Sequence, residues 1–244
     1  MSKRDSRKFA QFLDTGLRLH QAGDVQHAKH FYEQALKARP HHPAALNLLG
    51  VATMQSGQTD AGIAFLEQAV ALRPEDIAFL TNLASGYLDL GRIDEALGVF
   101  RRAINLAPRD PDLRIGEGNC LAMLGRLAEA EADLRIATRE HPRHVLGWFN
   151  LANAIKDQGR EQEAADLYLH VTQLAPDFAQ AYNNLGIALY RLGQLENSEQ
   201  AYQACIKLMP DFLPAYANLA IVLNDLRRPQ EAEALCRQSL SRDP

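Results

Sequence analysis

Apolar residues along this chain recur at helical spacing in short runs, and each run stops at a Gly or before a Pro. In residues 179–212 a first run consists of Tyr182, Leu185, Ile187, Leu189 and Leu192. Gly193 follows it, and Gly just past a helix supplies the left-handed conformation that satisfies the last carbonyl groups. A second run, Ser198 to Leu208, ends before Pro210, which cannot continue a helix. The pattern therefore predicts an antiparallel helical hairpin.

This hairpin pattern repeats with a period of 34 residues. Seven prolines keep the period without drift, namely Pro40, Pro74, Pro108, Pro142, Pro176, Pro210 and Pro244, and six glycines do the same, namely Gly23, Gly57, Gly91, Gly125, Gly159 and Gly193. The units are 9–42, 43–76, 77–110, 111–144, 145–178, 179–212 and 213–244, and we expect a basic, flexible tail at 1–8. Because such units bury their apolar faces by stacking on their neighbours, the period predicts one all-α solenoid of about seven repeats.

Residue size follows the same period. Small residues recur where helices must approach closely, as at Gly50, Gly186 and Ala96, and large ones such as Tyr182 and Tyr202 fill the space between them. This order of aromatic, Leu, Gly or Ala, and Pro resembles the tetratricopeptide repeat over essentially the whole chain after residue 8. The resemblance implies a right-handed superhelix whose first helices line a concave groove, and a role in holding partner proteins.

Two units depart from the pattern. In 111–144 the first helix carries Arg114 and Glu117 where other copies have apolar residues, together with Gly116 and Gly118. Interior Gly costs about 1 kcal/mol of helix propensity, so we expect this helix to be the weakest. In the last unit Arg227-Arg228-Pro229 replaces the usual Gly turn, which places the corner of that hairpin in question.

Asparagine recurs on the first helices, where the resemblance places the groove. Asn82, Asn150, Asn184 and Asn218 share one repeat place, and Asn119 and Asn153 lie three residues further along in neighbouring copies. A side-chain amide offers one acceptor and two donor hydrogens, so a row of amides can bond a peptide backbone whatever its side chains. Such a row resembles the repeat arm of O-GlcNAc-transferase-like proteins, which grips extended client peptides. Further groove candidates are Phe149, Lys156, Asn183 and Tyr190.

The alternative for these asparagines is structural: Asn at this place would support packing of the neighbouring repeat. A different groove is disfavoured outright. Tetratricopeptide proteins that hold chaperone C-termini resemble one another in a clamp of Lys and Arg. The corresponding places here hold Asn47, Thr81, Ile115, Phe149 and Asn183, then Leu48, Gly116, Asn150 and Asn184, and none is basic. The charge-assisted bonds that such a clamp needs are missing.

Composition narrows the classes of partner. The chain has 244 residues and a net charge of −4, and only its first eight residues are notably basic, so we expect no nucleic-acid partner. No apolar stretch approaches the roughly 18 residues that span a membrane, so we expect no membrane partner. Cys120, Cys205 and Cys236 are odd in number and far apart, which favours unpaired thiols, packed in the core, in the cytoplasm.

Enzyme chemistry has little support in these residues. Gly116-Glu117-Gly118 looks like the start of a phosphate loop, but no strand precedes it and the third Gly is absent. Histidines crowd the first repeat at His20, His27, His30, His41 and His42, yet no Cys or clustered acid completes a set of metal ligands. We therefore expect no catalytic residue, no metal and no cofactor.

The sequence favours a scaffold that binds an extended segment of a protein partner in its groove. The alternative is the substrate-recruiting arm of a larger enzyme, such as an O-GlcNAc-transferase-like glycosyltransferase that continues past Pro244. Leu235 and Leu240 would then lie on a face with nothing stacked against it, although Arg242 replaces a recurring Leu. Self-association through the C-terminal repeat is a further expectation.

Overall fold

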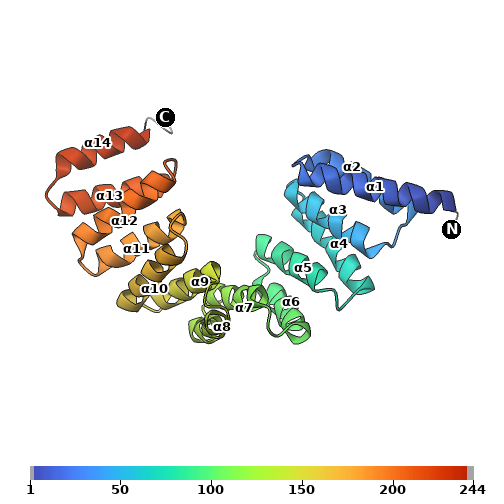
Figure 1. The fold of residues 1–244 in the computed structure, drawn as a ribbon, viewed down its shortest axis with the longest axis horizontal. Coiled ribbons are helices and arrows are strands. Elements are labelled where there is room, and N and C mark those ends of the chain that lie inside the picture. Colours follow the sequence, from blue (N-terminus) through green and yellow to red (C-terminus); the bar gives the residue numbers. More distant parts are fainter. Residues whose placement is uncertain (1–2, 241–244) are drawn as a thin grey trace. The chain divides into compact units, whose positions relative to one another are not determined.

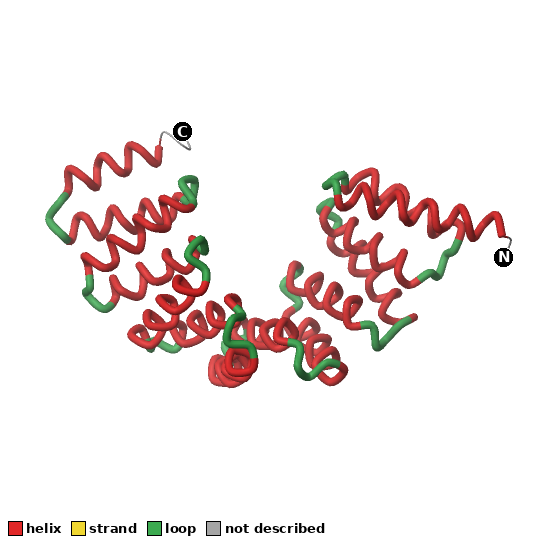
Figure 2. Tube along the Cα trace, in the orientation of Figure 1, coloured by secondary structure: helices red, strands yellow, loops and turns green. Residues whose placement is uncertain are grey.

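The computed structural model describes residues 3–240 as fourteen α-helices joined by short loops, with no strand in that range (Figures 1 and 2). The all-α fold class and the tandem helix-turn-helix repeats are therefore confirmed. The chain divides into two compact units, an N-terminal unit of residues 1–123 and a C-terminal unit of residues 124–244. The boundary falls inside the departing repeat 111–144, between its two helices.

The N-terminal unit holds three hairpins and one further helix. Its helices are α1 (Lys3–Gln21), α2 (Val25–Ala38), α3 (Pro43–Gln55), α4 (Thr59–Leu72), α5 (Ile77–Asp89), α6 (Ile93–Leu106) and α7 (Pro111–Met123). Each helix packs against the next one along the chain. Ala28, Ala35, Ala69 and Ala103 are fully buried between large side chains such as Tyr32 and Leu66, as close-packed repeats require.

The C-terminal unit begins with a second helix and continues with three hairpins. Its helices are α8 (Leu127–Glu140), α9 (Val145–Asp157), α10 (Glu161–Leu174), α11 (Ala179–Arg191), α12 (Leu195–Leu208), α13 (Leu213–Asp225) and α14 (Pro229–Leu240). Consecutive helices again pack on one another. Tyr168 and Tyr216 are fully buried, and each repeat therefore contributes to a core shared with its neighbours.

The first helix starts earlier than the sequence pattern suggests. Residues 3–8, expected to form a flexible tail, are instead the first turns of α1. Phe9 is buried beneath Arg39, whose guanidinium lies 4.5 Å from the centre of the ring, and Arg39 Nη2 also donates to Ser6 Oγ at 3.3 Å. These contacts fix the start of α1 against the end of α2. Met1 and Ser2 lie outside the described residues.

The hairpin corners depend on one backbone conformation. The six periodic glycines have φ between 71° and 81°, the left-handed region that ends a helix. In the last repeat Arg227 takes the same conformation with φ 61°, and its amide nitrogen donates to the Asn224 carbonyl oxygen at 3.0 Å. The corner therefore forms without Gly, at a steric cost that Gly would avoid.

The last helix is partly exposed. Leu240 is 65% exposed, whereas Leu235 is half-buried against the core of the last two repeats, so only Leu240 matches the expected bare face. Cys236 is exposed, contrary to the expectation that all three cysteines lie in the core. Tyr202 occupies the repeat place of Cys236 one repeat earlier, and it is buried in a cluster with Leu219 of the following helix. In the described range no further helix follows α14 to cover Cys236 in the same way. Arg242 and Pro244 lie outside that range.

Candidate functional site

The predicted groove residues divide unequally between the two units. Asn82 on α5 and Asn119 on α7 belong to the N-terminal unit. The C-terminal unit holds the other eight on its first helices, with Phe149, Asn150, Asn153 and Lys156 on α9, Asn183, Asn184 and Tyr190 on α11, and Asn218 on α13. We call the side of α9, α11 and α13 that carries Asn150, Asn184 and Asn218 the amide face.

One asparagine pair occurs in both units with the same geometry. Asn82 Nδ2 donates to Asn47 Oδ1 at 3.0 Å, and Asn218 Nδ2 donates to Asn183 Oδ1 at 3.4 Å. In each pair the acceptor is 35 residues earlier and 7% exposed, so it lies in the seam between two first helices. These bonds tie successive repeats together, which is the structural role that the sequence left open for this place.

Asn153 is the centre of a second amide cluster. Its Oδ1 accepts from Tyr168 Oη at 2.6 Å and from Asn184 Nδ2 at 3.0 Å, and Asn184 Oδ1 accepts from Asn183 Nδ2 at 3.2 Å. Burial raises the pKa of Tyr168, so its hydroxyl remains protonated and a donor. Each bonded amide uses only part of its capacity, because one Nδ2 carries two hydrogens. The cluster orients the amides and leaves hydrogen-bonding groups on the amide face.

Asn150 differs from its neighbours at the same repeat place. It is half-buried and has no hydrogen-bond partner among the described residues, and the same holds for Asn119 in the N-terminal unit. The full donor and acceptor capacity of Asn150 is therefore available to a ligand.

The remaining candidates are less exposed than an anchor for a ligand would be. Phe149 is half-buried, with its ring centre 4.9 Å from that of Phe178 and 5.9 Å from that of Tyr168. Tyr190 Oη donates to Asp225 Oδ2 at 2.7 Å, across to the next repeat. Lys156 Nζ lies 3.2 Å from Asp157 Oδ1, with 23% of its side chain exposed. These groups border the amide face, and among them only Tyr190 bonds to the next repeat.

Two apolar residues of this face were missed by the sequence analysis. Ile221 on α13 is 50% exposed, and Ile187 on α11 is half-buried. Both occupy the repeat place of Asn153, one and two repeats further on, and that spacing was the signal that could have found them. In the N-terminal unit the corresponding side of α3 and α5 contains a hollow of about 230 Å³, lined by Val51, Met54, Gln55, Asn82, Ser85 and Asp89. Amides beside apolar surface suit a peptide backbone with apolar side chains.

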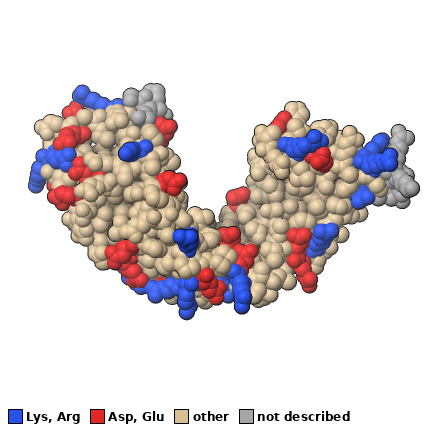
Figure 3. Space-filling view, viewed as in Figure 1, with Lys and Arg blue, Asp and Glu red and all other residues tan. Residues whose placement is uncertain are grey.

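Charge and metal-binding groups add little to this site. No three His, Cys, Asp or Glu side chains come together in a metal-binding arrangement anywhere in the described range. His20 bonds instead to the Tyr32 hydroxyl at 3.1 Å and to Gln55 Oε1 at 2.7 Å. On the face shown in Figure 3, basic and acidic side chains are interspersed on both units, and no broad basic surface is visible. None of the helices between residues 3 and 240 has the length and hydropathy of a membrane span.

The sequence matches tetratricopeptide repeat models along most of its length. Models described as tetratricopeptide repeat match residues 19–86, 81–137, 179–212 and 215–242, and one described as TPR repeat matches residues 152–193. No curated protein matches the chain. The structural matches are numerous, and three of them illustrate the range.

A tetratricopeptide repeat protein from Parabacteroides merdae is similar with a TM-score of 0.80 at 16% identity, over 98% of this chain and 94% of that one. A thermophilic TPR protein from Thermus thermophilus is similar with a TM-score of 0.60 at 25% identity, over 75% and 99%. YrrB, described as a TPR protein with an unusual peptide-binding site, has a TM-score of 0.56 at 18% identity, over 75% and 95%. The family models and the shared fold agree, and the chain belongs to the tetratricopeptide repeat family.

Proposed function

We propose that the chain is a protein-interaction scaffold whose amide face binds an extended segment of a partner protein. The observation that carries this proposal is the state of the amides. The side chain of Asn150 has no hydrogen-bond partner within the described chain, Asn184 is oriented by bonds with Asn153 and Asn183, and Asn218 is oriented by one bond to Asn183. Fixed amides lose little rotational freedom on binding, which favours affinity. An extended peptide brings free backbone groups that match them.

The surroundings of the amides support a peptide rather than a charged small molecule. Ile187 and Ile221 offer apolar surface beside Asn184 and Asn218, while Lys156 and Asp157 neutralise each other at the edge. Asn183 is buried, so we assign it to positioning Asn218 rather than to contact with the peptide. The similarity in fold to YrrB, a peptide-binding TPR protein by its description, is consistent with this use of the repeat. We infer recognition without covalent chemistry.

The proposal places this binding in the cytoplasm. Cys120 and Cys205 are buried and unpaired, which fits a reducing compartment. Burial raises the pKa of Cys120 to about 11 and raises that of Cys205, so both thiols stay protonated and unreactive. No observation on the described residues favours the alternative of a glycosyltransferase arm.

The experiment separates the packing role of the asparagines from the binding role. A positional-scanning library of acetylated, amidated decapeptides is used to select a ligand, and its affinity is measured by fluorescence anisotropy. Asn150→Ala removes no side-chain bond within the chain, so it should leave thermal stability unchanged. It should lower the affinity for the peptide by about 2- to 12-fold, the equivalent of one hydrogen bond. Asn184→Ala should lower both the affinity for the peptide and the thermal stability, because this variant loses the hydrogen bond between Asn184 and Asn153.

The triple variant with Ala at Asn150, Asn184 and Asn218 should bind the peptide with at least about tenfold lower affinity, while its helical circular-dichroism signal persists. Asn105→Ala, on the exposed side of α6, is the matched control and should change neither quantity. Unchanged affinity in the triple variant, for a peptide that binds the parent chain, would exclude the amide face as the binding site.

A further inference from the structure

The C-terminal unit contains three hollows at one repeat spacing, on the side away from the amide face. Each lies over a first helix and between two second helices: about 300 Å³ over α9 between α8 and α10, about 440 Å³ over α11 between α10 and α12, and about 450 Å³ over α13 between α12 and α14. Their lining residues correspond with a shift of 34, as Leu151, Leu185 and Leu219 show. We call them the first, middle and last hollows.

Ion pairs cross the first hollow. Arg135 Nη2 lies 2.7 Å from Glu131 Oε1 and 2.8 Å from Glu163 Oε1, and Arg160 Nη1 lies 2.7 Å from Glu131 Oε2. Arg160 also pairs with Glu163, so four side chains from α8, α10 and the turn before α10 form one closed network. Burial alone would raise the pKa of Glu131, but hydrogen bonds from Arg160 and Gln158 hold it below its ordinary value.

The same four places in the middle hollow carry no charge. Residues 131, 135, 160 and 163 correspond to Ala165, Leu169, Gln194 and Asn197, and all four of these line the middle hollow. In the last hollow the places hold Glu199, Gln203, Arg228 and Glu231, and Arg228 pairs with Glu199 at 2.6 Å and with Glu231 at 2.7 Å. Only the middle hollow of the three therefore lacks a charged network over its floor.

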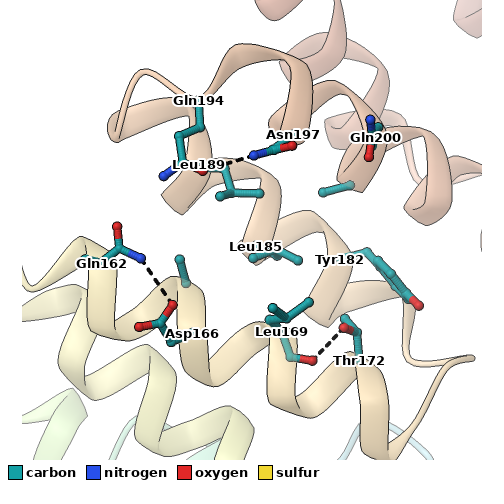
Figure 4. A pocket seen from close by; sticks show the side chains of 12 residues that line it. Gln162, Asp166, Leu169, Thr172, Tyr182, Leu185, Leu189, Gln194, Asn197 and Gln200 are labelled. Carbon is teal, nitrogen blue, oxygen red and sulfur yellow. Dashed lines mark hydrogen bonds between the residues drawn. The ribbon is translucent and has the colours of Figure 1, made fainter.

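The result is an open apolar floor with an amide rim (Figure 4). Leu185 and Leu189 of α11 form the floor, and Leu169 of α10 is 48% exposed beside them. The rim carries Gln162, Gln194, Asn197 and Gln200, and Asp166 is the one charged side chain of the lining. Gln162 Nε2 donates to Asp166 Oδ1 at 3.1 Å, which holds the carboxylate at one end of the hollow.

We propose that the middle hollow is a second recognition site, which binds an extended apolar segment of a partner protein with a basic residue at one end. Large apolar side chains of the segment cover Leu169 and Leu189 and rest on Leu185, which is already buried, and the Lys or Arg pairs with Asp166. The amides of the rim favour an extended segment over a helix, because a helix already satisfies its own backbone groups. The volume of about 440 Å³ lies within the range of about 300–1,000 Å³ that is common for binding pockets.

This site is separate from the amide face. Tyr182, Leu185 and Leu189 lie on one side of α11, whereas Asn184 and Ile187 lie on the other side in the order that 3.6 residues per turn requires. The two sites share only this helix. A ligand can therefore be assigned to one or the other by substitutions that touch one side.

The test transfers the network between the two hollows. In the closed variant, Ala165→Glu, Leu169→Arg, Gln194→Arg and Asn197→Glu rebuild the network of the first hollow over the middle one. In the opened variant, Glu131→Ala, Ala132→Asp, Arg135→Leu, Arg139→Gln, Arg160→Gln and Glu163→Asn give the first hollow the residues that the middle hollow carries at these places, including the counterpart of Asp166. The probe is a library of acetylated, amidated heptapeptides with two adjacent positions restricted to Leu, Ile, Phe or Trp and with Lys or Glu at either end. Binding is followed by anisotropy and by methyl NMR shifts of Leu169 and Leu189.

The parent chain should select Lys-containing apolar peptides, and these peptides should shift the methyl NMR signals of Leu169 and Leu189. The closed variant should bind the same peptides at least tenfold more weakly. Asp166→Lys should reverse the preference from Lys to Glu, and Asn150→Ala should have no effect. The opened variant should bind a second equivalent of the same peptide. If the closed variant does not fold, Leu169→Arg alone should reduce binding at least fivefold.

Three results would overturn the proposal. One is the absence of any library peptide that shifts Leu169 and Leu189, and another is equal affinity in the parent, closed and Leu169→Arg chains. The third is a dimer of the parent chain, measured by sedimentation without peptide, that the closed variant abolishes, because the occupant would then be a second copy.

Discussion

Helices α7 and α11 occupy the same place in their repeats and differ at two of three successive positions. In α11 these are Asn184, Leu185 and Gly186, the regular sequence, and in α7 they are Gly116, Glu117 and Gly118. Leu185 is 7% exposed and apolar, whereas Glu117 is 8% exposed and charged. A charge therefore lies where five other repeats bury a Leu, namely Leu49, Leu83, Leu151, Leu185 and Leu219.

Each substitution in α7 is matched by a residue of the preceding helix. Arg101 on α6 lies with its Nε 2.7 Å from Glu117 Oε1, and the ring of Phe100 fills the space where a side chain at position 116 would begin. In α10, which precedes α11, the corresponding residues are Leu169 and Tyr168. The comparison teaches that a repeat can accommodate a residue that departs from the repeat pattern when the neighbouring repeat carries a residue that compensates for it.

The largest effect should come from removing the partner of Glu117. Arg101→Ala leaves a buried carboxylate without its cation and should lower the free energy of unfolding by about 3 kcal/mol. Arg135→Ala is the matched control at the same repeat place in α8, and it should cost less than about 1 kcal/mol, because Glu131 keeps Arg160. Urea denaturation followed by circular dichroism measures both. Equal losses in the two variants would show that Glu117 does not depend on Arg101.

A smaller effect should follow from filling the space at Gly116. Gly116→Ala places a Cβ into the Phe100 ring and should destabilise the chain by about 1–2 kcal/mol, although Ala is the better helix former. Gly98→Ala on α6 is the control, since no atom lies within 4 Å of its added Cβ, and it should stabilise by up to about 1 kcal/mol. A gain at both positions would mean that Phe100 moves aside without cost.

The sequence predicted the repeat and its period better than the contacts that distinguish one repeat from another. Gly193 and Pro210 each follow a helix, and the structure ends these helices at Arg191 and Leu208, because backbone conformation is set by a few local residues. The pair of Glu117 with Arg101 joins residues 16 apart in sequence and depends on how two helices pack. The bonds among the asparagines depend on side-chain rotamers, so sequence spacing placed Asn184 on the first helices but could not show that it donates to Asn153.

The smallest effect concerns local opening. The sequence predicts that α7 is the weakest helix, because its interior glycines lower helix propensity by about 1 kcal/mol each. Helix α11 has Gly186 at the place of Gly118, so Gly116 is the glycine that distinguishes the two helices. The packing on Phe100 and the Arg101 pair offset part of that deficit, and Leu113, Cys120 and Leu121 are almost fully buried. We therefore expect amides in residues 113–122 to exchange with an opening free energy about 1 kcal/mol below that of residues 183–192. Native-state hydrogen exchange measures both segments in one experiment.

The double variant Arg101→Leu with Glu117→Leu shows which feature causes this difference in protection. It gives α6 and α7 the residues that α10 and α11 already carry at these places, Leu169 and Leu185. If the charged pair weakens α7, protection of 113–122 should rise toward that of 183–192, since replacing a buried ion pair with apolar residues is often neutral or stabilising. If Gly116 is the cause, the difference should persist unchanged. Equal protection in the parent chain would contradict the prediction of a weak α7 and would mean that its packing fully compensates for Gly116.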